Sequence, residues 1–203
     1  MWKLLKFAAV IMLILGLVYV ISVYKDRKTL NDQIIRLHVV ADTDDPVDQA
    51  VKLQVRDEIL RLVDTIKEGA ATKEEALKRL KEQLPELQKA ANAVLKQLGK
   101  KYSAVVTLLE EAFPTRYYDT FTLPAGVYDS LRVTIGSGEG KNWWCVVFPE
   151  LCVPTAVADV KSTAIEAGFS DTLSKTLTHQ EGYKVRFWIL DFWGRLQNYF
   201  HMG

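Results

Sequence analysis

The sequence has two cysteines and three histidines, the residue types that form Cys–His catalytic pairs and zinc sites: Cys145, Cys152, His38, His179 and His201. A cysteine nucleophile needs a histidine within hydrogen-bond reach that activates the thiol. The sequence places no histidine beside either cysteine, and these five residues show none of the short ligand spacings of a zinc site. We therefore predict no catalytic residue, no metal site and no cofactor.

The two cysteines are a candidate disulfide. Six residues separate Cys145 from Cys152, and the segment 148–151 between them contains a proline that could reverse the chain. Disulfides persist in exported proteins, so the pairing depends on where the domain resides. Two reduced, buried cysteines are the alternative that the sequence leaves open.

A glycine-rich stretch, 136–141, has some features of a phosphate-binding loop. Such a loop needs a Gly-Lys-Ser/Thr ending and a following helix whose N-terminus binds the anion. Here Asn142 follows Lys141, and the next apolar run has the pattern of a strand. We therefore predict a hairpin loop, in which the glycines supply positive φ angles.

The aromatic string Asn142-Trp143-Trp144 is the strongest candidate for molecular recognition. On a strand, the two tryptophans point to opposite faces, so both faces must be covered or used. Cover by another segment of the chain is one explanation. Binding of a partner is the other, because interface anchors favour Trp, Tyr and Arg. With Tyr117 and Tyr118, these three residues form our candidate partner-binding set.

The N-terminal segment predicts export. Residues 7–23 form a run of 17 residues without a charge, with basic residues on both sides: Lys3, Lys6, Lys25, Arg27 and Lys28. A helix this apolar has no polar face for water, and its length is near the lower limit of a membrane span. The basic start and apolar centre also fit a secretory signal, although no Ala-x-Ala cleavage pattern follows. Residues 1–28 are therefore a signal peptide or a signal anchor, and either exports residues 29–203.

The charge balance separates the same two parts. The whole chain has 26 basic and 25 acidic side chains, and removing the five basic and one acidic of residues 1–28 leaves 21 and 24, a net of −3. A mildly acidic domain argues against nucleic acid as a partner. With 49% hydrophobic residues, residues 29–203 can form the core of a single extracytoplasmic domain.

Hydrophobic periodicity predicts the elements that position these residues. Strands are expected at 33–41, 103–109, 121–123, 131–135, 143–148 and 185–190. One helix is expected from 46 to about 69, and a second from 72 to 99 with a break at Leu84-Pro85. Residues 153–182 are expected to be weakly structured or insertion-like, and 192–200 to be a short amphipathic helix docked on the core or on a membrane surface. The prediction is an α+β fold: a mostly antiparallel sheet with two or three helices packed on one face, preceded by an N-terminal hydrophobic export helix.

Several strings resemble the stage II sporulation protein R family. They are IRLHVVAD at 35–42, KLQVRD at 52–57, FPT at 113–115, LPAGVY at 123–128 and GEGKNWWCVVFPELC at 138–152. The last string, with its second cysteine, is the most specific of the five. Glu150 stands where a proline is expected in the family, which affects the turn between the cysteines.

The resemblance implies a signalling protein of sporulation that is not an enzyme. Such a protein is made in the forespore and exported to the intermembrane space. It is thought to activate a membrane-embedded aspartic protease, stage II sporulation protein GA, which processes the sigma-E precursor. The implied partners are that protease and, through the N-terminal segment, the membrane; no nucleic acid or small-molecule substrate is implied. The alternatives are an envelope enzyme that uses Cys145 with His38, and an envelope protein that binds peptidoglycan.

Overall fold

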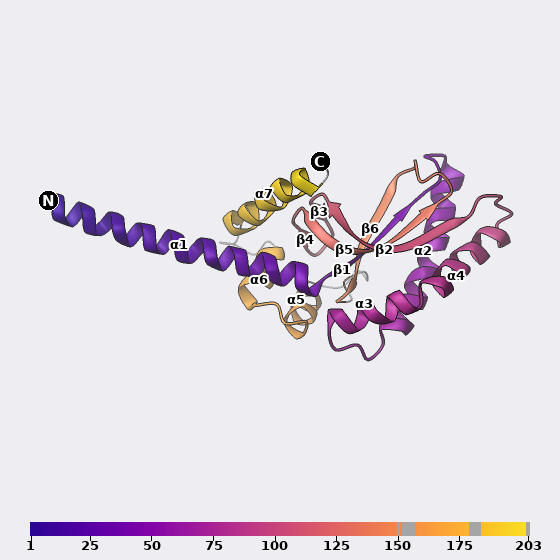
Figure 1. Ribbon diagram of the computed structural model, residues 1–203, viewed down its shortest axis with the longest axis horizontal. Helices are drawn as coiled ribbons and strands as arrows, with labels where there is room; N and C mark the ends of the chain where they lie inside the picture. Colours follow the sequence, from indigo (N-terminus) through magenta and orange to yellow (C-terminus); the bar gives the residue numbers. More distant parts are fainter. Residues whose placement is uncertain (150, 152–156, 179–183, 202–203) are drawn as a thin grey trace.

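One four-stranded sheet with helices on both faces forms the body of the protein, and the N-terminal helix projects from it (Figure 1). The computed structural model describes residues 1–149, 151, 157–178 and 184–201. In chain order the elements are α1 (Trp2–Gln33), β1 (Ile35–Val40), α2 (Pro46–Lys67), α3 (Lys73–Glu82), α4 (Leu84–Gln97), β2 (Ala104–Phe113), β3 (Arg116–Tyr117), β4 (Thr122–Leu123), β5 (Gly126–Ile135), β6 (Asn142–Phe148), α5 (Val157–Glu166), α6 (Asp171–Leu177) and α7 (Lys184–His201).

The strands are ordered β2-β5-β1-β6 across the sheet. β2 pairs with β5 and β6 pairs with β1 in antiparallel fashion, whereas β1 and β5 are parallel. The mostly antiparallel α+β sheet expected from the sequence is therefore confirmed. β3 and β4 form a separate two-stranded hairpin.

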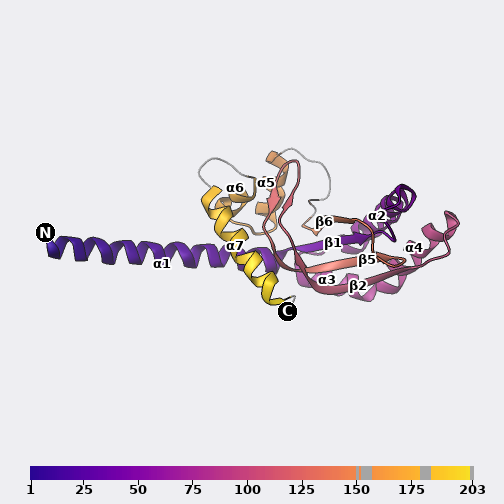
Figure 2. The same ribbon diagram turned by 90° about the horizontal axis from the view of Figure 1, so that it is seen from above.

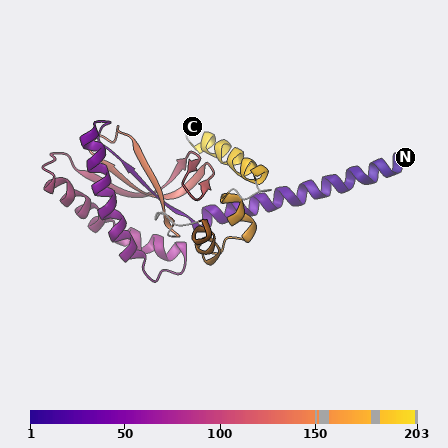
Figure 3. The same cartoon turned by 180° about the vertical axis from the view of Figure 1, so that it is seen from behind.

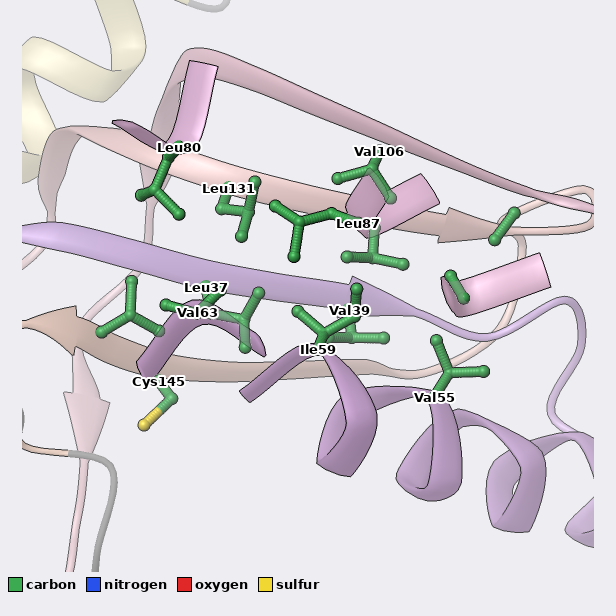
Figure 4. Packing of buried hydrophobic residues seen from close by; sticks show 14 of the residues in the cluster. Leu37, Val39, Val55, Ile59, Val63, Leu80, Leu87, Val106, Leu131 and Cys145 are labelled. Carbon is green, nitrogen blue, oxygen red and sulfur yellow. The ribbon is translucent and has the colours of Figure 1, made fainter. Parts of the chain in front are cut away.

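Helices α2, α3 and α4 cover one face of the sheet. The first core cluster lies between them and the strands, and it includes Val55, Ile59, Leu87, Leu37 and Leu131 (Figure 4). These apolar residues recur at helical spacing on α2 and at every second position on β1, so both elements turn an apolar face inward. The three expected helices on one face are confirmed.

The predicted break at Pro85 is also present. α3 ends at Glu82 and α4 begins at Leu84, so Pro85 lies in the first turn of α4. In this position the missing N–H costs no helical hydrogen bond, whereas inside a continuous helix it would. The proline thus separates two helices that the apolar pattern alone would have joined.

The second face of the sheet is covered as well, although the predicted fold places its helices on one face only; cover of this face by another segment is one of the two explanations for the paired tryptophans. The C-terminal third of α1, the β3–β4 hairpin and helices α5, α6 and α7 pack there (Figures 2 and 3). The second core cluster includes Leu30, Phe113, Tyr128, Leu173 and Leu190. All six residues of β1 are buried, as is typical of a strand covered on both faces.

The strand predicted at 185–190 is wrong, because this segment is the start of the 18-residue helix α7. Phe187, Asp191, Gly194 and Asn198 are buried at three- and four-residue spacing, so the segment packs through one helical face. A short apolar run satisfies both periodicities, and tertiary packing selected the helix. The described part of 153–182, expected to be weakly structured, forms α5 and α6; its origin as an insertion stays a prediction.

The glycine-rich loop at 136–141 is not a hairpin loop, so this prediction is wrong as well. It connects β5 to β6, and β1 lies between these two strands in the sheet. The predicted positive φ angles are present at Gly136 (59°) and Gly138 (68°). The loop crosses over the end of β1 and binds the β1–α2 connection, where Asp42 accepts a hydrogen bond from Ser137 N (2.6 Å) and Asp44 accepts one from Lys141 N (2.7 Å). This connection sets the start of β6, and therefore the position of Asn142.

Helix α1 is long and apolar enough to cross a membrane, by its length and composition. None of its most apolar 18-residue window is buried, and the helix projects away from the sheet (Figure 1). Further along, Val23, Asp26 and Leu30 are buried against the domain. Packing on the domain therefore begins at Val23, before the boundary expected at residue 29.

Candidate functional site

The predicted partner-binding residues separate onto two faces of the sheet. Asn142, Trp143 and Trp144 open β6, an edge strand whose neighbour is β1. Trp143 packs against the first core cluster, and the guanidinium carbon of Arg56 on α2 lies 4.9 Å from its ring centroid. Trp144 points to the opposite face, as alternation on a strand requires. The structure thus brings Trp144 and Asn142 into one site and leaves Trp143 outside it.

Trp144 lies between two side chains from different elements. The ring of His38 on β1 stacks against it with a centroid separation of 5.4 Å. On the β3–β4 hairpin, the guanidinium carbon of Arg116 lies 3.2 Å from the Trp144 ring centroid. A cation held over an indole face is attracted by the ring quadrupole, most strongly where water is excluded. The result is a layered His38–Trp144–Arg116 stack at the edge of the sheet.

Both ring nitrogens of His38 are engaged. Nδ1 lies 2.9 Å from a carboxylate oxygen of Glu111 on β2, and Nε2 lies 2.8 Å from Oδ1 of Asn142. Glu111 also accepts a hydrogen bond from Arg132 on β5 at 3.0 Å. Burial alone would raise the pKa of Glu111, but the hydrogen bond from His38 and the charges of His38 and Arg132 outweigh it and lower that pKa. His38 therefore positions Asn142 and Trp144.

Arg36, two residues before His38, lies deeper on the same face. It is fully buried, its guanidinium carbon lies 4.0 Å from the Phe113 ring centroid, and Nη2 donates to the hydroxyl of Tyr118 at 2.9 Å. The Arg36 Nε and Nη1 atoms and the Arg116 Nε atom are buried without an acceptor among the described residues. Burial lowers the pKa of Arg116, and the charge of nearby Arg36 adds to this, while the interaction with Tyr118 opposes it only in part. The interior of the site is cationic.

The two tyrosines of the predicted set have different roles. Tyr118 is partly buried, and its ring stacks on Phe121 with a centroid separation of 4.6 Å. Tyr117 is 76% exposed on the same hairpin that carries Arg116. Tyr117 is thus free for contact with a partner, whereas Tyr118 holds Arg36.

Sequence reasoning missed Glu111, Arg116 and Arg132 as members of this site. Glu111 lies on β2 and Arg132 on β5, and strand order brings them to the site: Arg132 is directly opposite His38 on β5, and Trp144 is opposite His38 on β6. Arg116 lies on β3 of the separate hairpin and reaches Trp144 through tertiary packing. No local pattern in the sequence says which of these elements are neighbours.

The structure separates Cys145 and His38, the pair on which the alternative of an envelope enzyme depends. Cys145 is directly opposite Leu37 on β1, is 3% exposed and belongs to the first core cluster, whereas His38 is on the other face. Cys152 lies outside the described residues, so its disulfide with Cys145 stays a prediction. Among the residues that the structure describes, no group of three or more His, Cys, Asp or Glu side chains could hold a metal ion.

Comparison with known proteins identifies the family. A model of the stage II sporulation protein R family matches residues 31–158, which include every residue of the site above. The curated stage II sporulation protein R of Bacillus subtilis (strain 168) is 36% identical over 121 residues, covering 60% of this chain and 54% of that relative. The match thus spans about half the length of the relative, and no solved structure matches. Since the family model covers more than half of the chain, the protein belongs to the stage II sporulation protein R family.

Proposed function

We propose that this protein is an extracytoplasmic signal that activates the membrane-embedded aspartic protease stage II sporulation protein GA. The activated protease would process the sigma-E precursor. Membership of the stage II sporulation protein R family is the observation that carries the proposal. In this proposal, the protein is made in the forespore and exported, with α1 as its signal or membrane anchor.

The surface around Trp144 is the proposed contact with the protease. Asn142 and Tyr117 are exposed, and Trp144 is partly buried against the second core cluster. His38 and Arg116 hold the indole ring in place before any partner binds. Because an anchor held in one orientation loses little entropy on binding, such a residue is suited to be an interface hot spot.

Activation requires that the signal bind the active form of the protease better than the inactive form. A ligand shifts a conformational equilibrium only by its differential affinity for the two states. A shift from 1% to 99% active needs a difference of about 10⁴-fold in affinity. One ordered aromatic contact supplies part of that difference, and the rest must come from the surrounding surface.

An enzyme that uses Cys145 with His38 is not proposed. The two side chains face opposite sides of the sheet, and His38 is already bonded through both ring nitrogens. A cysteine nucleophile needs its base within hydrogen-bond reach, about 3 Å. The pair could meet only if β1 or β6 turned over.

The test is co-reconstitution of the full chain in vesicles with the protease and the sigma-E precursor. Added wild-type protein is expected to start precursor cleavage, which is read on a gel. Tyr117→Ala is the sharpest variant, because Tyr117 is 76% exposed and its loss should not affect folding. Val47→Ala, which changes a 60% exposed residue on α2, is the matched control.

The expected result is that Tyr117→Ala and Trp144→Ala slow cleavage while Val47→Ala does not. Trp143→Ala, on the other face, is expected to act through stability only. Cleavage that proceeds equally without the added protein would refute the signalling role. If neither Tyr117→Ala nor Trp144→Ala slows cleavage, the surface around Trp144 is not the contact with the protease, while the signalling role still stands. A pull-down with purified cell wall tests the peptidoglycan alternative separately.

A further inference from the structure

Helix α7 carries an apolar surface that the domain leaves uncovered. Its inward face is buried through Phe187, Leu190 and Asn198. Its outward face is also apolar and mostly aromatic, and the exposed residues are Trp188 (66%), Phe192 (51%), Trp193 (51%), Leu196 (36%), Tyr199 (73%) and Phe200 (74%). Contiguous exposed apolar patches of this kind mark interaction sites.

The position of α7 beside α1 indicates what covers this surface. Figures 1 and 2 both show α7 next to the C-terminal third of α1, where the projecting helix enters the domain. Arg27 of α1 donates hydrogen bonds to Leu190 O (3.2 Å) and to the side chain of Gln197. At the other end of α7, Arg186 pairs with Asp26 (2.5 Å) and donates to Ser22 Oγ (2.7 Å). α7 is therefore attached to the helix that is able to cross the membrane.

The depth of α7 relative to the apolar run of α1 can be worked out. The uncharged run ends at Val23, and the guanidinium carbon of Arg186 lies 5.8 Å from the ring centroid of Tyr19, four residues earlier. Four residues of helix span about 6 Å. The Arg186 side chain in the first turn of α7 thus reaches about 6 Å past the end of the apolar run, within the roughly 5–10 Å to which interfacial helices bury their apolar face in the headgroup and acyl-chain boundary. Trp and Tyr are the residues that membranes favour at this level.

An apolar cavity of about 710 Å³ lies between the two helices. Tyr19, Val23 and Tyr24 line it from α1, and Trp193, Leu196 and Phe200 line it from α7. Lys28 is at its rim, and Lys25 is exposed one turn away, so cations lie where the headgroups of anionic lipids would be. The cavity joins the aromatic face of α7 to the lipid-facing surface of α1.

From this continuity we propose that α7 is a second membrane contact, whose aromatic face lies in the lipid leaflet on the side of the domain. α1 would cross the bilayer, while α7 would lie in the interface and fix the tilt and rotation of the sheet above it. The chemical class of the ligand is a phospholipid surface, with acyl chains in the cavity and anionic headgroups at Lys25 and Lys28. The proposal needs α1 to span the membrane, and it does not depend on the protease.

The test measures depth in the bilayer for two matched positions. Phe192 on α7 and Val105 on β2 are both 51% exposed, and each is changed to Cys and labelled with an environment-sensitive fluorophore in the full chain. Unmodified protein treated in the same way gives the background from Cys145 and Cys152. The labelled proteins are reconstituted in vesicles of phosphatidylcholine and phosphatidylglycerol, with or without doxyl-labelled phosphatidylcholine.

Doxyl lipid is expected to reduce the emission at position 192 by about twofold or more, and most strongly when the doxyl group is near the headgroup. Emission at position 105 should stay unchanged. An equal loss of emission at the two positions on addition of doxyl lipid would overturn the proposal. Emission at 192 that is insensitive to doxyl lipid but varies with the protein-to-lipid ratio would also overturn it, in favour of contact with a second protein chain. If Phe192→Cys does not fold, Phe200→Cys, on the same face and 74% exposed, replaces it.

Discussion

The ion pair between Asp26 and Arg186 tests whether α1 is part of the folded domain. Asp26 lies in α1 and Arg186 in α7, with 2.5 Å between Oδ2 and Nε and side-chain exposures of 9% and 11%. At this distance and an effective dielectric constant near 20, the attraction is about 7 kcal/mol before desolvation is subtracted. Removal of one partner leaves a buried, unpaired charge, which costs about 3–5 kcal/mol.

Asp26→Ala is therefore expected to lower the free energy of unfolding by about 3–5 kcal/mol. For a chain of this size, that corresponds to a melting temperature lower by about 6–20 °C. The assay is thermal unfolding of the full chain in detergent micelles, followed by tryptophan fluorescence. The double variant Asp26→Leu/Arg186→Met should recover most of the loss, because two apolar residues replace a buried pair at little cost.

Two results would refute this reasoning. One is a change of less than about 2 °C for Asp26→Ala, which would mean that α1 does not pack on α7. The other is a double variant no more stable than the single one, which would mean that the charge pair is not the cause. Lys89→Ala is a suitable control, since its ion pair with Glu86 is exposed at 77% and 58% and should contribute little.

Three further predictions address the sheet and its loops. The pKa of Asp48 is lowered to about 2 by hydrogen bonds from Lys100, Thr43 and Tyr102. The ionised carboxylate should therefore contribute about 1 kcal/mol to the free energy of unfolding after solvent screening. This contribution should be complete above pH 4 and lost as the pH falls toward 2. Urea unfolding between pH 2 and 6 checks this, and Asp48→Asn should not show that part of the pH dependence. Arg36→Met is expected to leave stability unchanged or to raise it, because Arg36 is fully buried with two donors unsatisfied; a loss above about 2 kcal/mol in urea unfolding would contradict this reading. Glu111→Gln should cost about 1–3 kcal/mol by weakening the acceptor for His38 and Arg132. Arg132→Met, at 35% side-chain exposure, should cost less in the same assay.

The local elements of the sequence were largely predictable. Helix α2 begins at Pro46 as predicted, because proline suits the first turn of a helix, and Asp45 caps it by accepting a hydrogen bond from Val47 N. Pro85 separates α3 from α4, and the alternation of Ile35, Leu37 and Val39 identifies β1. These predictions succeeded because capping, proline geometry and hydrophobic period act over a few neighbouring residues.

The failed predictions have a common physical cause. The glycine loop was expected to be a hairpin loop because β5 and β6 are consecutive in sequence, yet β1 inserts between them. The segment 185–190 satisfies both the period of a strand and that of a helix, and burial of Leu190 in the second core cluster decides for the helix. In both cases the deciding contacts join separate parts of the chain: Ser137 with Asp42 for the loop, and Arg27 of α1 with Leu190 O for α7.

The sequence by itself determined the apolar N-terminal helix, the α+β class, the family and the aromatic string at 142–144, since each depends on residue type and short-range order. Only the tertiary structure decided how that string is used. Strand order places His38 beside Trp144 and brings Glu111 to His38, while packing of the β3–β4 hairpin brings Arg116 over the Trp144 ring. Trp143 faces the opposite core. Packing also joins the end of α1 to α7 and leaves an aromatic surface beside the apolar helix α1. The strands and helices that become neighbours are those whose apolar faces bury one another. The hydrophobic period of a single sequence identifies each apolar face, but it does not show which face packs against which.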